Sequence, residues 1–153
     1  MIAIIQRVTE ASVQVSGEDR AMGSIGRGLC VLACVVRGDG PEQAEWMAGK
    51  IARLRIFPDE AGRFDRSVVD EGGSVLLVSQ FTLAADCARG NRPGFSAAAP
   101  PEEARPLLEH LRQELQDRYG IEVATGRFAT DMRVALVNDG PVTISLQSPA
   151  RPE

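Results

Sequence analysis

The sequence predicts a single α+β domain in which two main helices pack outside a curved, largely antiparallel sheet or barrel. Segments with the apolar pattern of strands outnumber those with helical spacing, and the closing strands follow one another closely enough to pair antiparallel. The length of 153 residues suits one core, and 44% hydrophobic with 25% charged residues is ordinary globular usage. We therefore expect one packed domain over residues 1–147.

The first half of the chain is predicted to begin with two strands. Residues 2–15 form the first, a long strand that can bend, because Ala11, Val13 and Val15 alternate with polar residues. A stretch with four glycines follows, and these glycines mark turns. Residues 29–36 are then a continuous apolar run, as in a strand buried on both faces.

The first helix is predicted to start at Asp39-Gly40-Pro41-Glu42, with a possible capping box, and to reach about Arg53. The apolar residues at helical spacing are Ala44, Met47, Ala48, Ile51 and Leu54. A short strand at 54–57, a loop at 58–73 and a strand at 75–83 are expected to follow.

The second helix is predicted over residues 101–119, although Pro106 leaves its start open. Its apolar face is Leu107, Leu108, Leu111 and Leu115. Strands at 121–128, 132–137 and 142–146 close the chain, and the turn Asn138-Asp139-Gly140-Pro141 separates the last two. Residues 148–153 are expected to be a loose tail.

Charge and composition narrow the function classes. A net charge of -4 and a pI near 5.1 argue against DNA binding, and they limit any RNA contact to a small footprint. One candidate contact is the loop with Arg89, Asn91 and Arg92, which could equally be a solvated loop. The apolar N-terminal segment is too short for a signal sequence or membrane span, which favours the cytoplasm.

The side chains offer no familiar catalytic set. The single histidine, His110, is expected on the surface of the second helix, which argues against a Ser-His-Asp mechanism. Cys30 and Cys34 lie in an apolar run and should be buried structural thiols, while Cys87 has no nearby histidine to activate it. No cysteine spacing or carboxylate pair indicates a metal site. Side-chain chemistry alone leaves the function open.

Two segments point further: Ser79-Gln80-Phe81-Thr82-Leu83 and Asn138-Asp139-Gly140-Pro141-Val142-Thr143. Each alone could be an ordinary strand end or turn. Together they resemble the signature pair of the D-aminoacyl-tRNA deacylase family. The resemblance extends over nearly the whole chain, through Gln6-Arg7-Val8, Leu54-Arg55-Ile56-Phe57, Arg92-Pro93 with Phe95, and Gly126-Arg127-Phe128.

The resemblance implies a proofreading hydrolase that cleaves the ester between a D-amino acid and the terminal adenosine of tRNA. It implies a symmetric homodimer whose partner is the aminoacylated 3′ end of tRNA, without metal or organic cofactor. The positions implied to be catalytic are Ser79, Gln80, Phe81 and Thr82. Backbone N–H groups of Phe81 and Thr82 would hold the oxyanion, and the substrate's own 2′-OH would assist.

Substrate binding is implied at five further positions. Gly140-Pro141 of the partner subunit would enter the pocket with a cis peptide bond and exclude L side chains, so that D-residues and also mischarged glycine are expected substrates. Phe128 and Met132 would flank the adenine, and Arg7 would brace the Gly-Pro element. Phe128 and Met132 could instead be core residues, and Arg7 a surface arginine. The loop at 86–90 and Gly94 depart from the family's usual sequence, which affects expected RNA contacts.

Two other functions stay open from the sequence. The same scaffold could serve a related deacylase that removes an achiral or L-configured residue. The chain could also be a non-catalytic dimeric module that binds a small ligand or nucleotide. Ester turnover on charged tRNA distinguishes these alternatives.

Overall fold

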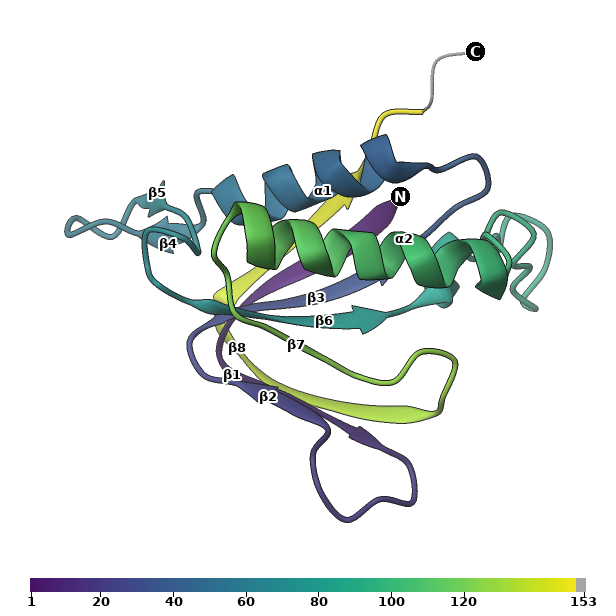
Figure 1. Cartoon of the computed structure of the whole chain (residues 1–153), viewed down its shortest axis with the longest axis horizontal. Coiled ribbons are helices and arrows are strands. Elements are labelled where there is room, and N and C mark those ends of the chain that lie inside the picture. Colours follow the sequence, from purple (N-terminus) through teal and green to yellow (C-terminus); the bar gives the residue numbers. More distant parts are fainter. Residues whose placement is uncertain (151–153) are drawn as a thin grey trace.

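The computed structural model describes residues 1–150, and its central strand is β1 (Ile2–Val15). β1 pairs antiparallel with β2 (Gly23–Ile25), β3 (Gly28–Cys34) and β8 (Met132–Gln147). It can hold three partners because β3 follows its first half, β2 its second half, and β8 its opposite edge along nearly the whole length (Figure 1).

The far side of the sheet is parallel. β6 (Ser74–Ser79) runs parallel to β3, and β7 (Val123–Thr125) runs parallel to β6. The sheet is therefore mixed and curves into a nearly closed barrel. This confirms the α+β class with a curved, largely antiparallel sheet and two helices, and it adds two parallel pairings that the sequence does not indicate.

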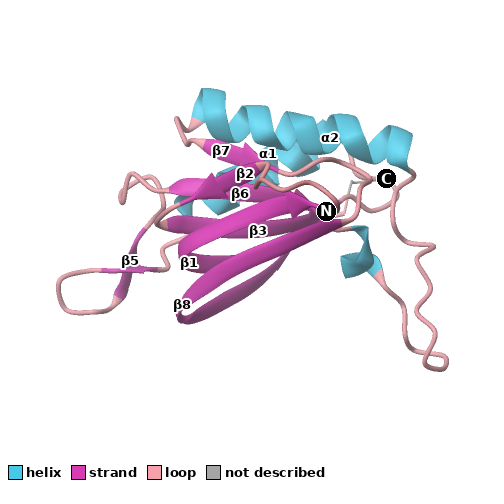
Figure 2. Cartoon of the chain, turned by 90° about the horizontal axis from the view of Figure 1, so that it is seen from below, coloured by secondary structure: helices cyan, strands magenta, loops and turns pink. Residues whose placement is uncertain are grey.

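Two helices cover one face of the sheet. α1 (Pro41–Arg53) and α2 (Pro101–Gln113) form one layer above the strands (Figures 1 and 2), and a π-helical turn, η2 (Glu114–Arg118), extends α2. α1 starts and ends where the sequence predicted. Its start carries half of a capping box, because the Gly40 N–H donates to Gln43 Oε1 at 2.9 Å. No helix in residues 1–150 has the length and apolar character needed to span a bilayer.

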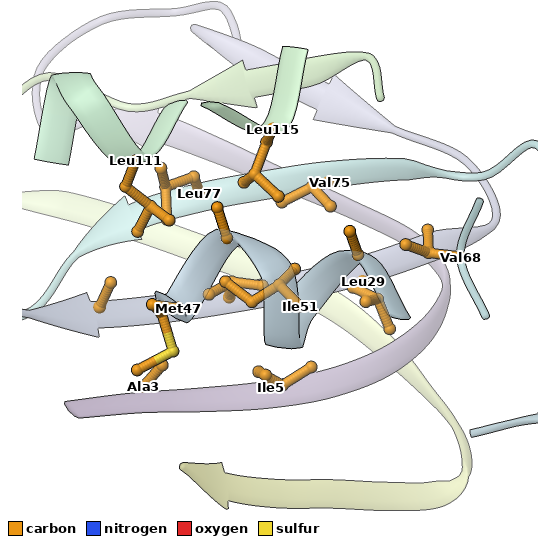
Figure 3. Packing of buried hydrophobic residues seen from close by; sticks show 14 of the residues in the cluster. Ala3, Ile5, Leu29, Met47, Ile51, Val68, Val75, Leu77, Leu111 and Leu115 are labelled. Carbon is orange, nitrogen blue, oxygen red and sulfur yellow. The ribbon is translucent and has the colours of Figure 1, made fainter. Parts of the chain in front are cut away.

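The main core lies between the helices and the sheet (Figure 3). Met47 and Ile51 of α1 and Leu111 and Leu115 of the second helical segment are fully buried there. Each such side chain contributes about 1.5–3 kcal/mol by leaving water. This burial confirms the apolar faces predicted from helical spacing.

A second, smaller core fills the inside of the curved sheet, around Val13, Cys30 and Leu76. β1 contributes to both cores because its register with β8 shifts between Gln6 and Val8 and again between Val8 and Glu10. Together the shifts exchange the faces of the strand, so that Ile5 faces the main core and Val13, eight residues further on, faces the smaller one. The bend expected in the first strand is therefore present, and it lies beside Arg7.

Several predicted boundaries were wrong. Residues 132–147 form one strand, β8, because β1 is long enough to pair with β8 on both sides of the Gly-Pro segment. The register shifts accommodate the extra residues of that segment. β8 does not pair with β7 within the described residues, since β7 lies beyond β6. The predicted strand at 121–128 shortens to the three residues that reach β6.

The other boundaries moved by a few residues. The strand predicted at 29–36 is Gly28–Cys34. The strand predicted at 75–83 ends at Ser79, and a 3₁₀ turn, η1 (Phe81–Ala84), replaces its last part. The short strand expected at 54–57 is instead β4 (Phe57–Pro58), which pairs with β5 (Phe64–Arg66).

The second helix starts at the predicted residue, whereas the C-terminal tail differs from the prediction. Pro106 lies inside α2, which starts at Pro101, so it does not set the helix start. Ser148 was expected in the loose tail but is buried, and its N–H donates to the Met1 carbonyl at 2.9 Å. The last part of the predicted tail, 151–153, lies outside the described residues.

Candidate active site

The candidate site opens where two parallel strands end. Ala33 of β3 pairs with Ser79 of β6, and the Gln80 N–H donates to the Ala33 carbonyl at 2.8 Å. The chain then leaves the sheet and turns into η1. A cavity of about 670 Å³ lies beside this turn.

Five of the residues predicted for the site line this cavity: Ser79, Gln80, Phe81, Phe128 and Met132. They come from two parts of the chain, 79–81 and 128–132, which the curved sheet brings together. Thr82 is adjacent and exposed, and its Oγ1 accepts a hydrogen bond from Gln80 Nε2. The Thr82 hydroxyl is thus already engaged by a neighbouring side chain.

Two backbone donors face no protein acceptor at this turn. Within residues 1–150, neither the Phe81 N–H nor the Thr82 N–H donates a hydrogen bond, whereas the next amide, Leu83 N–H, donates to the Gln80 carbonyl. The first N–H groups of a helical turn lack intrahelical partners for geometric reasons. The turn can therefore offer two adjacent amides to a bound anion or oxyanion.

An aromatic pair borders the cavity. The rings of Phe81 and Phe95 meet edge to face, with centroids 5.1 Å apart and an angle of 71°. Phe81 is 58% exposed, which is unusual for a side chain of this size. In the sequence, only the family resemblance indicates Phe95. The apolar residues before and along α2 that complete the wall, such as Ala99 and Leu108, carried no signal beyond helical spacing.

Cys34 was expected to be a buried structural thiol, and its burial is confirmed. It also lines the cavity, with Sγ 3.5 Å from the Phe81 carbonyl oxygen. Burial raises the pKa of this thiol, so it is not poised as a thiolate. Burial likewise raises the pKa of Cys30, to about 11, while Cys87 is exposed.

His110 lies on α2 and is not among the residues that line the cavity. Its Nε2 is 3.3 Å from Glu45 Oε1 on α1, so it bridges the two helices. This agrees with the expected surface position. In the described part of the chain, no group of three or more histidine, cysteine or acidic residues is arranged to hold a metal ion.

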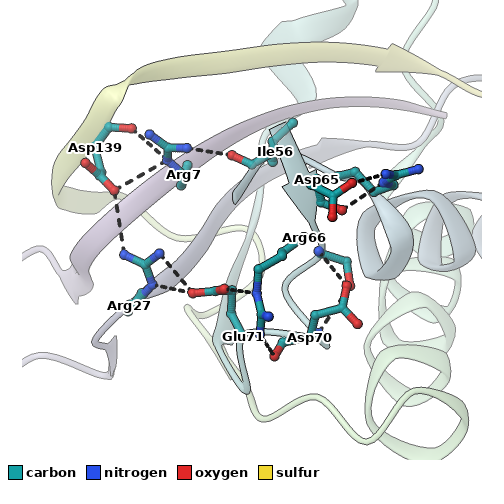
Figure 4. A network of polar contacts seen from close by, with 10 residues as sticks. Arg7, Arg27, Ile56, Asp65, Arg66, Asp70, Glu71 and Asp139 are labelled. Atoms are coloured by element: carbon teal, nitrogen blue, oxygen red, sulfur yellow. Dashed lines mark hydrogen bonds and ion pairs between the residues drawn. The ribbon is translucent and has the colours of Figure 1, made fainter. Parts of the chain in front are cut away.

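The predicted Gly140-Pro141 segment lies at a second place, beside Arg7. Figure 4 shows the polar contacts of Arg7 there. Arg7 is only 8% exposed. Its Nε donates to the Asp139 carbonyl at 3.0 Å, and its Nη1 donates to the Ile56 carbonyl at 2.6 Å. Arg7 is thus bonded to the residue directly before Gly140, and it is not a surface arginine.

A chain of ion pairs continues from this point (Figure 4). Asp139 Oδ2 is 3.4 Å from Arg7 Nε and 3.9 Å from Arg27 Nη1. Arg27 in turn pairs with Glu71 at 2.9 Å. Hydrogen bonds from Arg66, and then from Arg27, hold the pKa of Glu71 below its usual value. The Gly-Pro segment is therefore tied to the β4–β5 region by charge-assisted contacts.

The backbone at Gly140 requires glycine. Its φ is +136°, and a Cβ there would lie 2.7 Å from Val142 Cγ2. The Val142 N–H donates to Asn138 Oδ1 at 2.8 Å, which closes the segment from the other side. The Gly140-Pro141 peptide bond is cis, as the resemblance implied.

Within one chain, the two places lie apart. Arg7 pairs with Leu29, whereas Ser79 pairs with Ala33, four residues further along β3. That offset is about 13 Å along the strands. Gly140, Pro141 and Arg7 do not line the cavity formed by their own chain.

Comparisons with known proteins agree on one family. A family model described as D-Tyr-tRNA(Tyr) deacylase matches residues 4–147. A D-aminoacyl-tRNA deacylase of Cereibacter sphaeroides is 59% identical, covering 97% of this chain and 100% of the relative. A D-aminoacyl-tRNA deacylase of Chlorobaculum tepidum is 53% identical, covering 99% of this chain and 100% of the relative.

Solved structures show the same fold. A c-Myc DNA unwinding element binding protein superposes with a TM-score of 0.91 at 43% identity, covering 98% of this chain and all of that one. A probable eukaryotic D-amino acid tRNA deacylase superposes with a TM-score of 0.81 at 15% identity, covering 95% of this chain and 97% of that one. This likeness shows the fold alone. With the family model matched over 4–147 and relatives more than half identical over nearly the full length, this chain belongs to the D-Tyr-tRNA(Tyr) deacylase family.

Proposed function

We propose that this chain is a D-aminoacyl-tRNA deacylase, a hydrolase that releases the D-amino acid and free tRNA as a proofreading step of translation. Family membership supports the activity. The observation that carries the chemistry is the turn at Phe81 and Thr82, whose two amide groups have no acceptor within residues 1–150 and stand beside the cavity. Because the substrate is charged tRNA, the proposed place of action is the cytoplasm.

The proposed reaction uses position and backbone dipoles. Water attacks the ester carbonyl carbon, and the Phe81 and Thr82 N–H groups donate to the oxyanion that develops. The bond from that carbon to the ribose oxygen then breaks, and this oxygen takes up the proton that the attacking water has lost. The neighbouring 2′-OH orients the water. His110 takes no part, since its contact is to Glu45 on the helix layer.

The walls of the cavity suit a nucleoside. Phe128 offers a flat ring and Met132 a polarizable thioether, and both line the cavity from the β7–β8 side. We assign them to the terminal adenine. The aminoacyl group would then lie towards Phe81 and Phe95, beside the free amides. A contact limited to the terminal nucleotide agrees with the net charge of -4, because binding along duplex DNA needs a broad basic surface.

A second copy of the chain is proposed to complete each site. Gly140-Pro141 is held on both sides by the contacts of Asp139 with Arg7 and of Val142 with Asn138, yet it lies about 13 Å along the strands from its own cavity. β8 carries both parts, because Met132 and Val134 line the cavity and Gly140 follows further along. Two copies of β8 packed antiparallel across a two-fold axis would bring each Gly-Pro to the other chain's cavity.

This arrangement places the axis at Val137, which is midway between Val134 and Gly140 in sequence. Val137 is 49% exposed, and Val134 is also exposed. Among the described strands, β8 pairs with β1 alone, so its other edge is open. Replacing Val137 with Cys is expected to give a disulfide-linked dimer under mild oxidation, whereas the same change at Val69, an exposed valine near Glu71, should not.

Selection of the D-residue is proposed to be steric. The main chain of the partner's Gly140-Pro141 would occupy the space that an L side chain needs, while a D side chain points away. Glycine has no side chain to exclude, so mischarged glycyl-tRNA is expected to be cleaved as well. A rival deacylase for L-residues would show the reverse preference, and a binding module would show no turnover.

The direct test is ester hydrolysis on matched substrates. Purified protein is incubated with D-tyrosyl-tRNA, L-tyrosyl-tRNA and glycyl-tRNA on a non-cognate tRNA, and the remaining ester is followed over time. Rapid loss of the D-ester with the L-ester intact supports the proposal. Equal rates on the two tyrosyl enantiomers would refute the steric filter, and binding without turnover would refute the enzyme.

A further inference from the structure

Within residues 1–150, some arginines are paired with a carboxylate, whereas others, Arg105 among them, are not. Around Arg7 and along η2, arginines pair with carboxylates. Arg105 on α2 has no carboxylate oxygen within 4.0 Å in residues 1–150. The carboxylate one helical turn away, Glu109, is held by Arg112, with Nε 2.9 Å from Oε2. Arg105 is therefore a cation with free hydrogen-bonding capacity.

Arg105 is fixed next to the proposed adenine wall. Its guanidinium carbon lies 5.0 Å from the centroid of the Phe128 ring. It also lines a small hollow of about 120 Å³ that shares Ser79, Leu108 and Phe128 with the main cavity. The attraction between the guanidinium and the ring favours this position, while the N–H donors of Arg105 stay available.

We propose that Arg105 binds the 5′-phosphate group of the terminal adenosine of tRNA. The proposal rests on the proposed function, because a base at Phe128 brings its own phosphate within one nucleotide of the ring and hence next to Arg105. A planar guanidinium with free donors matches the oxygens of a phosphodiester. On a chain of net charge -4, a single such contact has a large share of the affinity for RNA.

The contact has two measurable consequences. Neutralising one phosphate of a single strand changes the slope of log affinity against log salt by about 0.7. Loss of Arg105 should therefore raise KM for D-tyrosyl-tRNA several-fold at low salt and flatten this slope by about that amount. A substrate that lacks the phosphate should not respond to the loss.

The experiment compares 3′-O-(D-tyrosyl)adenosine with the same compound carrying a 5′-phosphate. The variants are Arg105→Gln, which removes the charge, and Arg105→Lys, which keeps it. Arg118→Gln is the matched control, because Arg118 also lies over an aromatic ring, that of Tyr119 at 5.7 Å, but lines neither hollow.

For the wild-type protein and Arg118→Gln, the 5′-phosphate is expected to lower KM about three- to tenfold. For Arg105→Gln the gain in KM from the phosphate should vanish, and Arg105→Lys should keep part of this gain. The assignment would be overturned if Arg105→Gln raised KM equally for both compounds, or if the 5′-phosphate did not lower KM in the wild-type protein. Failure of the wild-type protein to hydrolyse either compound or D-tyrosyl-tRNA would instead refute the proposed function.

Discussion

The role of the backbone amides can be tested by removing one of them. Phe81→Pro eliminates the Phe81 N–H, and Phe81→Ala serves as the control that loses the ring but keeps the amide. Phe81 is the first residue of η1, a position that proline favours. The preceding residue, Gln80, has φ -146° and ψ 80°, outside the α region that a following proline disfavours. Both variants should therefore fold.

The expected magnitude follows from the geometry of the turn. No hydrogen bond within residues 1–150 is lost with the Phe81 N–H, so the free energy of unfolding should differ between the two variants by less than about 1 kcal/mol. In catalysis, one oxyanion donor contributes about 10²–10³ in kcat. Because Phe81 is 58% exposed in the free chain, we expect the lower value, about 100-fold.

The assay is single-turnover hydrolysis of D-tyrosyl-tRNA, which separates the chemical step from binding. Phe81→Pro should be about 100-fold slower than Phe81→Ala. Both variants lose the contact between the Phe81 and Phe95 rings, so any change in KM from that loss should be the same in the two. Equal single-turnover rates in two folded variants would show that the Phe81 amide is not a donor to the oxyanion.

Three further predictions concern residues around the site. His110→Ala should keep kcat within about threefold of wild type, and a loss of several orders of magnitude in folded protein would overturn the backbone mechanism. Arg7→Ala should lower the free energy of unfolding by about 2–4 kcal/mol, because two charged hydrogen bonds to carbonyl groups are lost. Arg55 is exposed, so Arg55→Ala should lower it by less than about 1 kcal/mol. Equal effects of the two substitutions in denaturant titrations would contradict this prediction. Glu71 has a lowered pKa in the folded chain. Its ionised carboxylate therefore stabilises the fold fully above the ordinary pKa of 4.5, and this stabilisation is lost as the pH falls below that value and through the lowered pKa. The stability difference between wild type and Glu71→Gln should therefore shrink below about pH 4.5, and a constant difference would argue against it.

Local patterns predicted the elements well because their causes are local. The helical spacing of Met47 and Ile51 and the alternation around Val13 reflect burial of one face, which the neighbouring sequence alone determines. Helix α1 was bounded correctly because Pro41 favours the first position of a helix and the apolar periodicity ends near Arg53. The resemblance, on the other hand, supplied the site segments that composition could not.

Strand pairing depended on distant parts of the chain and could not be predicted in the same way. The parallel pairing of β6 with β3 and β7 joins segments separated by helices, and nothing near Ser79 or Val123 in sequence indicates it. Asn138 to Pro141 looks like a turn, but β1 is long enough to pair on both sides of it, so one strand forms. For the same reason, the closeness of Cys34 to Phe81 appears only in the fold.

The central claim is that each active site is built from two chains, and mixing two defective variants tests it most directly. Phe81→Pro damages the cavity, and Gly140→Ala damages the Gly-Pro element, because a Cβ there meets Val142 and φ is +136°. Each homodimer should be nearly inactive. After unfolding and refolding together in equal amounts, half of the dimers should be mixed, and each mixed dimer has one site with both parts intact. The account predicts recovery of about a quarter of wild-type deacylation of D-tyrosyl-tRNA. No recovery, with mixed dimers shown to form, would mean that one chain builds its site alone and would contradict the account.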